Sequence, residues 1–233
     1  MKVLGLDSAT VACSAALCVD GELRSRRYEA MGRGQSEALV PMIEEVFSEA
    51  GFQAGDLDLI AVTVGPGAFT GLRIAIATAL GLSLASSVTA VGVSTMEALA
   101  YGARMENEGP GPIITALDSR RDDIYLQGFS EDGQALGDVE AVASDALASW
   151  ASTATLKGPA TLIGDAAERT IGAFAGAGLT IHLSLDHAVP DAAYVAALAA
   201  EKMLRGQTLL ELRPLYLRPP DAIVPKHGGR LRA

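Results

Sequence analysis

The chain has 233 residues, of which 49% are apolar and only 5% aromatic, and its formal net charge is −10 at pH 7. This length can bury the core of one large domain or of two small lobes, built here from small aliphatic side chains. The acidic balance argues against a protein that grips tRNA or DNA by itself, because such proteins usually present a basic face.

The N-terminus begins directly with a strand pattern, so we expect no signal peptide, and no apolar run has the length and flanks of a membrane span. The chain has 2 cysteines, Cys13 and Cys18, which lie in one expected strand. Their odd spacing places them on opposite faces of that strand, which argues against a disulfide. We therefore expect reduced thiols in a cytoplasmic protein that contacts no membrane.

The first half predicts a regular succession of strands and helices. Apolar patterns indicate strands at Val3–Asp7 and Ala12–Val19, and Asp20-Gly21 is a strong hairpin signal leading into a third strand. The expected elements that follow are a helix over Gln35–Ala50 with Gly51 as its C-cap, a strand over 57–64, a helix over 70–86 with Thr70 as its N-cap, and a strand over Thr89–Val93.

The opening pattern recurs about 110 residues further along the chain. The segment Ile113–Ser119 resembles Val3–Ser8, and both end in Leu-Asp-Ser. A second strand at Ile124–Phe129 leads to another Asp-Gly pair, Asp132-Gly133. These parallels indicate a duplicated fold, with the Gly- and Pro-rich segment Met105–Pro112 as the linker between its halves.

The second half has a weaker pattern. We expect helices over 144–151, 165–177 and Asp191–Arg205, and short strands over Leu162–Gly164 and Leu179–Leu183. This gives an N-terminal lobe (1–108), a smaller degenerate C-terminal lobe (109–190), and a C-terminal helix with an extended basic tail (191–233). Two β-β-β-α-β-α lobes in tandem resemble the α/β, ribonuclease H-like two-lobe fold of actin, sugar kinases and Hsp70 (the ASKHA fold). In that plan a nucleotide lies between the lobes, with its phosphates against the hairpin turns.

The run Gly65–Arg73 joins an apolar strand to a long apolar helix through a turn with two glycines and a proline. Glycines at such a junction permit positive φ and close backbone approach, and the helix N-terminus that follows is a ready anion site. The same residues also suit a tight β–α turn that binds nothing. The residues alone leave both interpretations open.

Four segments, Leu4–Thr10, Gly65–Arg73, Val91–Ser94 and Pro214–Arg218, together resemble the TsaB (YeaZ) family. The resemblance covers nearly the whole first lobe and returns at the C-terminus, and it is weak over residues 130–190. It implies a non-catalytic partner of TsaD, a transferase of related fold. With the small ATPase TsaE, this complex makes N6-threonylcarbamoyladenosine (t6A) in bacterial tRNA.

TsaD holds its metal ion with two histidines four residues apart on one helix face, a spacing that suits a divalent ion. The matching positions in this chain are Thr95 and Leu99, and a leucine cannot ligate a metal. The histidines of this chain, His182, His187 and His227, lack that spacing, and we interpret them as surface or turn residues. We therefore predict a pseudo-enzyme with no catalytic and no metal-binding residue. The alternative is a metal-dependent, glycoprotease-like hydrolase of the same fold.

The expected phosphate turn of the second lobe, Asp118–Asp123, has bulky and acidic residues where TsaD has glycines, although Arg120 and Arg121 partly offset the charge. In the first lobe we interpret Asp7 as a turn-capping carboxylate. The vestigial phosphate turns comprise Asp7, Ser8, Thr10, Gly65 and Gly67. We expect no cofactor bound by this chain alone, which disfavours a stand-alone kinase. ATP or ADP at the contact with TsaD stays open.

Arg73 is the only charged residue of the expected helix 70–86. A helix that is apolar nearly all round must be covered on more than one side. Its second side can be covered by the other lobe or by another chain, and Ala77, Gly81 and Ala85 would let another helix approach closely.

The resemblance implies that this helix and the helix 35–50 pack on the equivalent pair of TsaD, and that they form a homodimer when TsaD is absent. It also implies that tRNA is contacted only indirectly. The interface residues predicted on this basis are Leu39, Met42, Ile43, Val46, Leu72, Ile76, Ala79 and Leu80.

Overall fold

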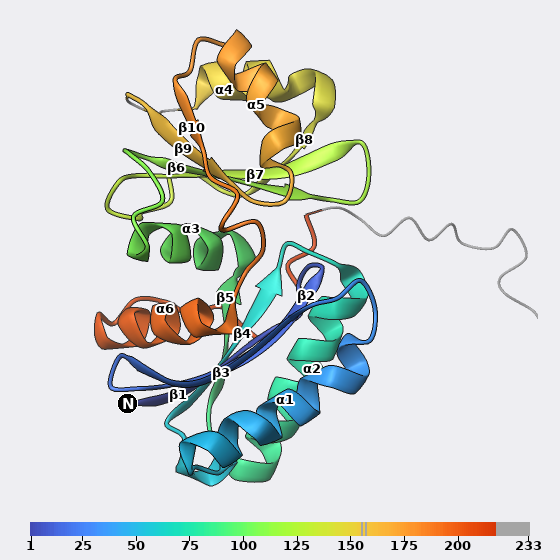
Figure 1. The fold of residues 1–233 in the computed structure, drawn as a ribbon, viewed down its shortest axis with the longest axis vertical. Helices are drawn as coiled ribbons and strands as arrows, with labels where there is room; N and C mark the ends of the chain where they lie inside the picture. Colours follow the sequence, from blue (N-terminus) through green and yellow to red (C-terminus); the bar gives the residue numbers. More distant parts are fainter. Residues whose placement is uncertain (155, 157, 218–233) are drawn as a thin grey trace, which may run out of the picture.

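The computed structural model of the chain describes residues 1–154, 156 and 158–217. Each of its two lobes is built on a five-stranded mixed sheet. Two helices, α3 (Thr95–Met105) and α6 (Ala192–Leu204), lie between the two sheets, and the other helices cover their outer faces (Figure 1).

The first lobe follows the predicted order closely. Its other elements are β1 (Lys2–Asp7), β2 (Ala12–Val19), β3 (Glu22–Ala30), α1 (Gln35–Ala50), the 3-10 turn η1 (Ala54–Asp56), β4 (Leu59–Gly65), α2 (Phe69–Ser86) and β5 (Ala90–Ser94). Asp20 and Gly21 both have positive φ between β2 and β3, and Gly51 ends α1 in the left-handed conformation, as expected. Helix α3 was not among the predicted elements.

The second lobe repeats this topology. Its elements are β6 (Ile113–Asp118), β7 (Asp123–Phe129), β8 (Glu140–Ala143), η2 (Ser144–Ala146), α4 (Leu147–Thr153), β9 (Ala160–Ile163), α5 (Ala167–Gly176) and β10 (Ile181–Leu183). The strand order β8-β7-β6-β9-β10 corresponds one to one with β3-β2-β1-β4-β5, which confirms the duplicated fold. The prediction missed β8, whose four residues carry no clear alternation.

The last helix of each lobe is exchanged between the lobes. Helix α6 packs on β1 and β2 of the first lobe, where a Cβ atom at Gly5 would lie only 2.0 Å from the Ala192 carbonyl oxygen. Asp191 caps α6 by accepting a hydrogen bond from the Ala193 amide (2.8 Å). Helix α3 in turn places Met96 and Leu99 in an apolar cluster of the second lobe. The predicted C-terminal segment therefore completes the first lobe with its helix, while residues 218–233 of the predicted tail lie outside the described residues.

The sheet of the first lobe has an apolar cluster on each face. Cys13 lies in the cluster under α1 and α2, and Cys18 lies in the cluster under α6, as their spacing predicts. Both thiols are free and buried, and burial raises the pKa of the Cys13 thiol to about 12. A thiol with such a pKa stays protonated and unreactive at neutral pH.

The turn after β1 packs directly against the start of α2. The Ser8 hydroxyl donates to the Gly71 carbonyl (2.7 Å), and the Ala68 amide donates to the Ala9 carbonyl (2.7 Å). Cβ atoms at Gly67 and Gly71 would lie 2.3 and 1.9 Å from the carbonyl oxygens of Ala9 and Ser8. Both glycines are therefore needed for the close approach between the start of α2 and the turn after β1. This favours the interpretation of Gly65–Arg73 as a tight β–α turn.

Helix α2 begins one residue earlier than predicted. Ala68 occupies its N-cap position without a side-chain hydrogen bond, so the assignment of Thr70 as the N-cap was wrong. By length and composition alone α2 is the one helix of the described residues that could cross a membrane. Its inner residues Leu72, Ile76 and Ala79 are instead buried against its own lobe.

We predict that Gly71→Ala destabilises the protein by about 1–3 kcal/mol or more, because the new methyl group would overlap a backbone oxygen that cannot move freely. Gly81→Ala in the same helix is the control, since no atom of the described residues outside the neighbouring part of α2 lies within 4 Å of its expected Cβ position. That substitution should stabilise α2 by roughly 0.5–1 kcal/mol. Urea unfolding of both variants measures the difference, and equal effects would contradict this account of the turn.

Candidate functional site

A cavity of about 550 Å³ opens between the lobes, at the place where the ASKHA plan brings the two hairpin turns together. It is lined by the turn after β1, the start of α2, the turn after β6 and the C-terminal segment. The lining residues are Ala9, Thr10, Gly67, Ala68, Phe69, Thr70, Arg73, Leu117, Asp118, Ser119, Arg120, Arg121, Tyr125, Asp165, Leu215, Tyr216 and Leu217.

Of the five predicted phosphate-turn residues, only Thr10 and Gly67 line this cavity. The Ser8 hydroxyl donates its hydrogen bond to the Gly71 carbonyl oxygen. Gly65 has a φ of 121° and lies against the C-terminal segment, where its expected Cβ position is 3.1 Å from the Leu215 carbonyl oxygen. The sequence placed these residues at the correct turn, but most of their groups face the protein interior.

Asp7 is fully buried beneath the first turn. One of its oxygens accepts hydrogen bonds from the Thr63 hydroxyl (2.5 Å) and the Ala9 amide (3.2 Å). The other oxygen has no hydrogen-bond partner among the described residues. Burial raises the pKa of the Asp7 carboxyl to about 7, against its ordinary value of 3.8. This geometry agrees with a turn-capping carboxyl group.

The second-lobe turn is filled by its own side chains together with Asp165, which precedes α5, and Arg169 of α5. The Asp118 amide donates to an Asp165 oxygen (2.7 Å), and the Arg169 guanidinium donates to the Asp118 carboxylate (3.2 Å). Arg120, held at a φ of 63°, lies 3.6 Å from Asp118 and 3.8 Å from Asp165. Burial raises the pKa of Asp165. Two carboxylates therefore occupy the wall where a phosphate-binding fold offers backbone amides.

An aromatic and cationic stack closes the cavity on the side of the C-terminal segment. The Arg73 guanidinium lies 3.7 Å from the centre of the Phe69 ring and donates to the Tyr216 hydroxyl (3.0 Å). The Phe69 and Tyr216 rings stack with centroids 5.6 Å apart. Sequence analysis missed this stack, although Tyr216 lies in the segment Pro214–Arg218 that it singled out.

The positions that match the metal-binding histidines of TsaD lie in the interior. Thr95 and Leu99 are 0% and 1% exposed at the start of α3. Leu99 packs against second-lobe residues such as Phe129. A metal ion at this place would have to enter an apolar interior, so the two residues do not form a site of the TsaD kind.

The predicted interface residues require a correction. Seven of the eight are at most 8% exposed and lie in the first-lobe core, and only Leu80, at 48%, is on the surface. The seven buried residues are Leu39, Met42, Ile43, Val46, Leu72, Ile76 and Ala79. Hydrophobic periodicity identified an apolar stripe on each helix, but these stripes face the sheet of their own lobe.

The free side of α2 is also apolar, and we call it the outer face of α2. Leu84 is 87% exposed, and Ala77 and Gly81 lie beside Leu80 and Leu84 on successive turns. Apart from the neighbouring residues and backbone of α2 itself, no atom of the described residues lies within 4 Å of the expected Cβ position at Gly81. The sequence left two possible covers for this face, the second lobe or another chain, and the described residues of the second lobe do not cover it.

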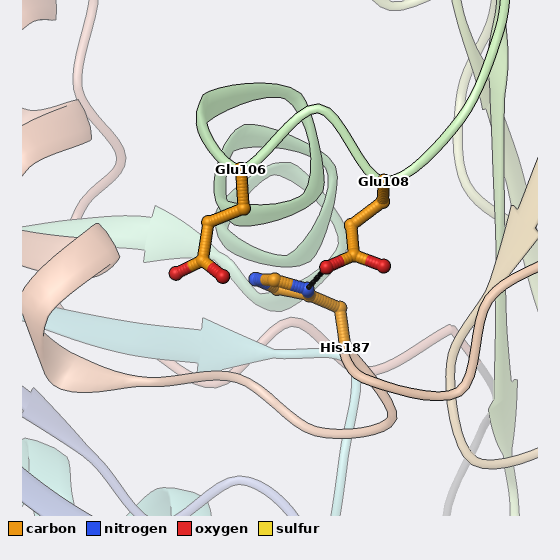
Figure 2. Close-up of side chains that lie close together, drawn as sticks. All are labelled: Glu106, Glu108 and His187. Atoms are coloured by element: carbon orange, nitrogen blue, oxygen red, sulfur yellow. Dashed lines mark ion pairs between the residues drawn. The ribbon is translucent and has the colours of Figure 1, made fainter.

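A group of potential metal ligands lies outside the cavity, where the chain passes between the lobes. Glu106, Glu108 and His187 come together there (Figure 2). His187 lies in a turn, as predicted, but it is buried, so its interpretation as a surface residue was wrong. Its glutamate neighbours lie about 80 residues earlier in the chain, and no local spacing could have indicated them.

Comparisons with known protein sequences point to proteins that act in the threonylcarbamoyl modification of tRNA. A family model described as TsaD, tRNA N6-adenosine threonylcarbamoyltransferase, matches residues 29–212. The tRNA threonylcarbamoyladenosine biosynthesis protein TsaB of Escherichia coli is 35% identical over 57% of this chain, and the match spans 56% of that protein. TsaB of Haemophilus influenzae is 27% identical over 94% of this chain and 94% of its own length.

Solved structures show the same fold. An uncharacterized protein from Pseudomonas aeruginosa, described as similar to peptidase YEAZ, has a TM-score of 0.76 and 29% identity, covering 93% of this chain and 99% of that one. The ROK hexokinase of Thermus thermophilus has a TM-score of 0.54 and 16% identity, covering 89% of this chain and 100% of its own. At that identity the hexokinase shares the fold alone, which confirms the sugar-kinase-like architecture.

We predict that Asp7 makes stability depend on pH. Its carboxyl keeps its proton to about pH 7 in the folded state but loses it near 3.8 when unfolded. The unfolded state therefore binds fewer protons between these values, and the free energy of unfolding falls as the pH rises, by roughly 4 kcal/mol at most.

Urea unfolding from pH 4 to pH 8 tests this dependence. Asp7→Asn should remove this part of the pH dependence, whereas Asp145→Asn, at an exposed aspartate, should keep the wild-type profile. Parallel profiles for the wild type and Asp7→Asn would show that Asp7 is ionised in the folded protein.

Proposed function

The chain belongs to the TsaB (YeaZ) family, and we propose that it acts in the cytoplasm in the biosynthesis of t6A in tRNA. In this proposal it is a non-catalytic subunit that docks on the transferase TsaD, and TsaE acts with the pair. The observation that carries the proposal is the outer face of α2, which is apolar, exposed and free of contact with the rest of the described chain.

The outer face of α2 suits a helix from another chain. Small residues at four-residue spacing let helix backbones approach closely, and Ala77, Gly81 and Ala85 provide that spacing on the exposed side. Leu80 and Leu84 flank this stripe with exposed apolar area. Helices α1 and α2 lie on the side of the first lobe that is turned away from the second lobe (Figure 1), so a partner can reach them without opening the molecule.

The non-catalytic part of the proposal is supported by how the cavity is filled. The Ser8 hydroxyl of the first turn and the glycines Gly67 and Gly71 near the start of α2 are used in contact with one another. On the side of the second lobe, Asp118 and Asp165 line the cavity. The buried pair Thr95 and Leu99 supplies no ligand for a metal ion of the TsaD kind. These features disfavour the alternative function as a hydrolase, which is also suggested by the description of the Pseudomonas aeruginosa protein as similar to a peptidase.

The same features bear on nucleotide and tRNA. Asp118 and Asp165 on the cavity wall disfavour phosphate, while Arg73, Arg120 and Arg121 on the same wall partly offset their charge. We propose that ATP or ADP binds only where TsaD adds groups to this site. The arginines of β3 are paired with acidic residues, Arg27 with Glu45 and Glu49 at 2.6 Å each, and Arg26 with Asp191. This pairing leaves a weak basic surface there, which favours indirect contact with tRNA.

A homodimer through the outer face of α2 is part of the proposal for the chain without TsaD. An isologous pair would bring the two copies of α2 together, each covering the other. Since both partners would use one face, TsaD should dissociate the homodimer.

Reconstitution of threonylcarbamoyl transfer tests the function directly. We expect TsaD and TsaE to modify an unmodified tRNA only when this chain is added. Transfer at the full rate without the chain would contradict the proposal, and so would a single substitution in this chain that abolishes transfer while TsaD binding is unchanged.

We predict that Leu84→Glu weakens binding to TsaD by about thirtyfold or more, the loss expected for a central interface residue worth about 2 kcal/mol. Leu204→Glu is the matched control, because Leu204 is 79% exposed at the end of α6, away from the proposed interface. Calorimetric titration with TsaD gives both affinities. Equal affinities for the two variants would exclude the outer face of α2 as the TsaD-binding surface. Ile76→Glu is not a suitable test, because Ile76 is buried and the substitution would disrupt the core.

A further inference from the structure

The chain passes between the lobes twice, and the two passages meet. Glu106 and Glu108 lie in the connection from α3 to β6, and His187 lies in the connection from β10 to α6. Figure 2 shows the imidazole of His187 between the two carboxylate groups, with the dashed line joining it to Glu108. This group is independent of the cavity and of the outer face of α2.

The three side chains lie close enough together to share a small divalent cation. One potential ligand atom from each residue lies within 4.8 Å of the others. The His187 Nδ1 atom is 3.3 Å from the nearest Glu108 oxygen. In a tetrahedral site with bonds of about 2.0–2.1 Å, neighbouring ligand atoms are about 3.3–3.4 Å apart. That pair already has the separation of two ligands of one ion.

The imidazole has the features of a metal ligand. His187 is only 8% exposed, and its Nδ1 atom has no hydrogen-bond partner among the described residues. A buried imidazole nitrogen beside a carboxylate oxygen, without hydrogen-bond geometry, needs positive charge between them. A metal ion or a proton can supply that charge, and a metal ion can take Glu106 as a third ligand.

The surroundings hold all three groups in place. The Tyr194 hydroxyl donates a hydrogen bond to Glu106, and the Ser184 hydroxyl donates one to Glu108. Such outer hydrogen bonds orient carboxylate ligands. Gly102 leaves room for the ring, since a Cβ atom there would lie 2.9 Å from the His187 Nε2 atom.

A second cavity, of about 600 Å³, provides a path for an ion. Glu106 and His187 line it together with Asp186, Asp191 and Arg26, and Arg26 pairs with Asp191, so the net charge of the wall stays negative. Acidic walls raise the local concentration of cations. An ion can therefore reach the group without separating the lobes.

We propose that Glu106, Glu108 and His187 bind a divalent transition-metal ion of the Zn²⁺ class, which ties together the two passages between the lobes. One imidazole nitrogen with two carboxylate oxygens is a ligand set for Zn²⁺ or its neighbours rather than for Ca²⁺. The ion leaves one coordination position for water, and its role is to hold the lobes at a fixed angle.

Titration of the untagged, metal-free protein with Zn²⁺ and with Co²⁺ tests the site. We expect one ion per chain and a Co²⁺ absorption spectrum typical of nitrogen and oxygen ligands. His187→Gln and Glu108→Gln should abolish both, and His182→Gln, at an exposed histidine outside the group, should change neither. No binding by the wild type, or equal binding by His187→Gln, would overturn the proposal and leave a proton as the bridging charge.

Thermal unfolding provides a second readout, because a ligand that binds only the folded state raises its stability. Zn²⁺ at about a hundred times its Kd should raise the Tm of the wild type by about 5–10 °C. Tyr194→Phe, which keeps all three ligands, should weaken metal binding by about 10–100-fold while the metal-free Tm stays close to that of the wild type. A Zn²⁺-induced shift of the same size in His187→Gln would place the ion elsewhere.

Discussion

The contact between the turn after β1 and the start of α2 is the constraint on which the rest of this structure depends. It is made of backbone groups that meet at two glycines, Gly67 and Gly71, and of one hydroxyl, that of Ser8. In a phosphate-binding fold, similar glycines leave room for a ligand. Here the chain itself takes that room, and the same contact fixes α2 on its sheet.

This contact has a consequence at the surface. Once the inner face of α2 is fixed in the core, the opposite face, with Leu80 and Leu84, must point away from the lobe. Exposed apolar area of this kind on a protein surface usually marks a binding site. The filled turn and the exposed apolar face therefore follow from one arrangement of the same helix.

The exchange of α3 and α6 joins the two lobes more tightly than a linker would. Each helix completes the core of one lobe while its chain neighbours belong to the other, so the lobes share their apolar clusters. The two connections that this exchange requires lie side by side and carry Glu106, Glu108 and His187. The angle between the lobes can change only if these two connections bend. An ion bound by the three residues would join the connections and so restrict that change.

Much of the fold could be predicted from the sequence because its signals are local or repeated. Asp20-Gly21 indicated a hairpin, the recurrence of Leu-Asp-Ser at Asp118 indicated the duplication, and Gly51 marked the end of α1.

What failed depends on tertiary packing. Periodicity found the apolar stripes of α1 and α2 but could not say that residues such as Ile76 face their own sheet. Nor could spacing indicate that His187 meets Glu108, because only the exchange of helices brings their segments together.

Thiol accessibility at the outer face of α2 tests the central claim most directly. The natural cysteines, Cys13 and Cys18, are 0% and 4% exposed, so a cysteine introduced by Leu84→Cys would be the accessible thiol, with Leu204→Cys as the reference position. If this chain docks through α2, saturating TsaD will strongly slow alkylation at position 84 and leave position 204 unchanged. Equal alkylation rates at position 84 with and without bound TsaD would contradict the account.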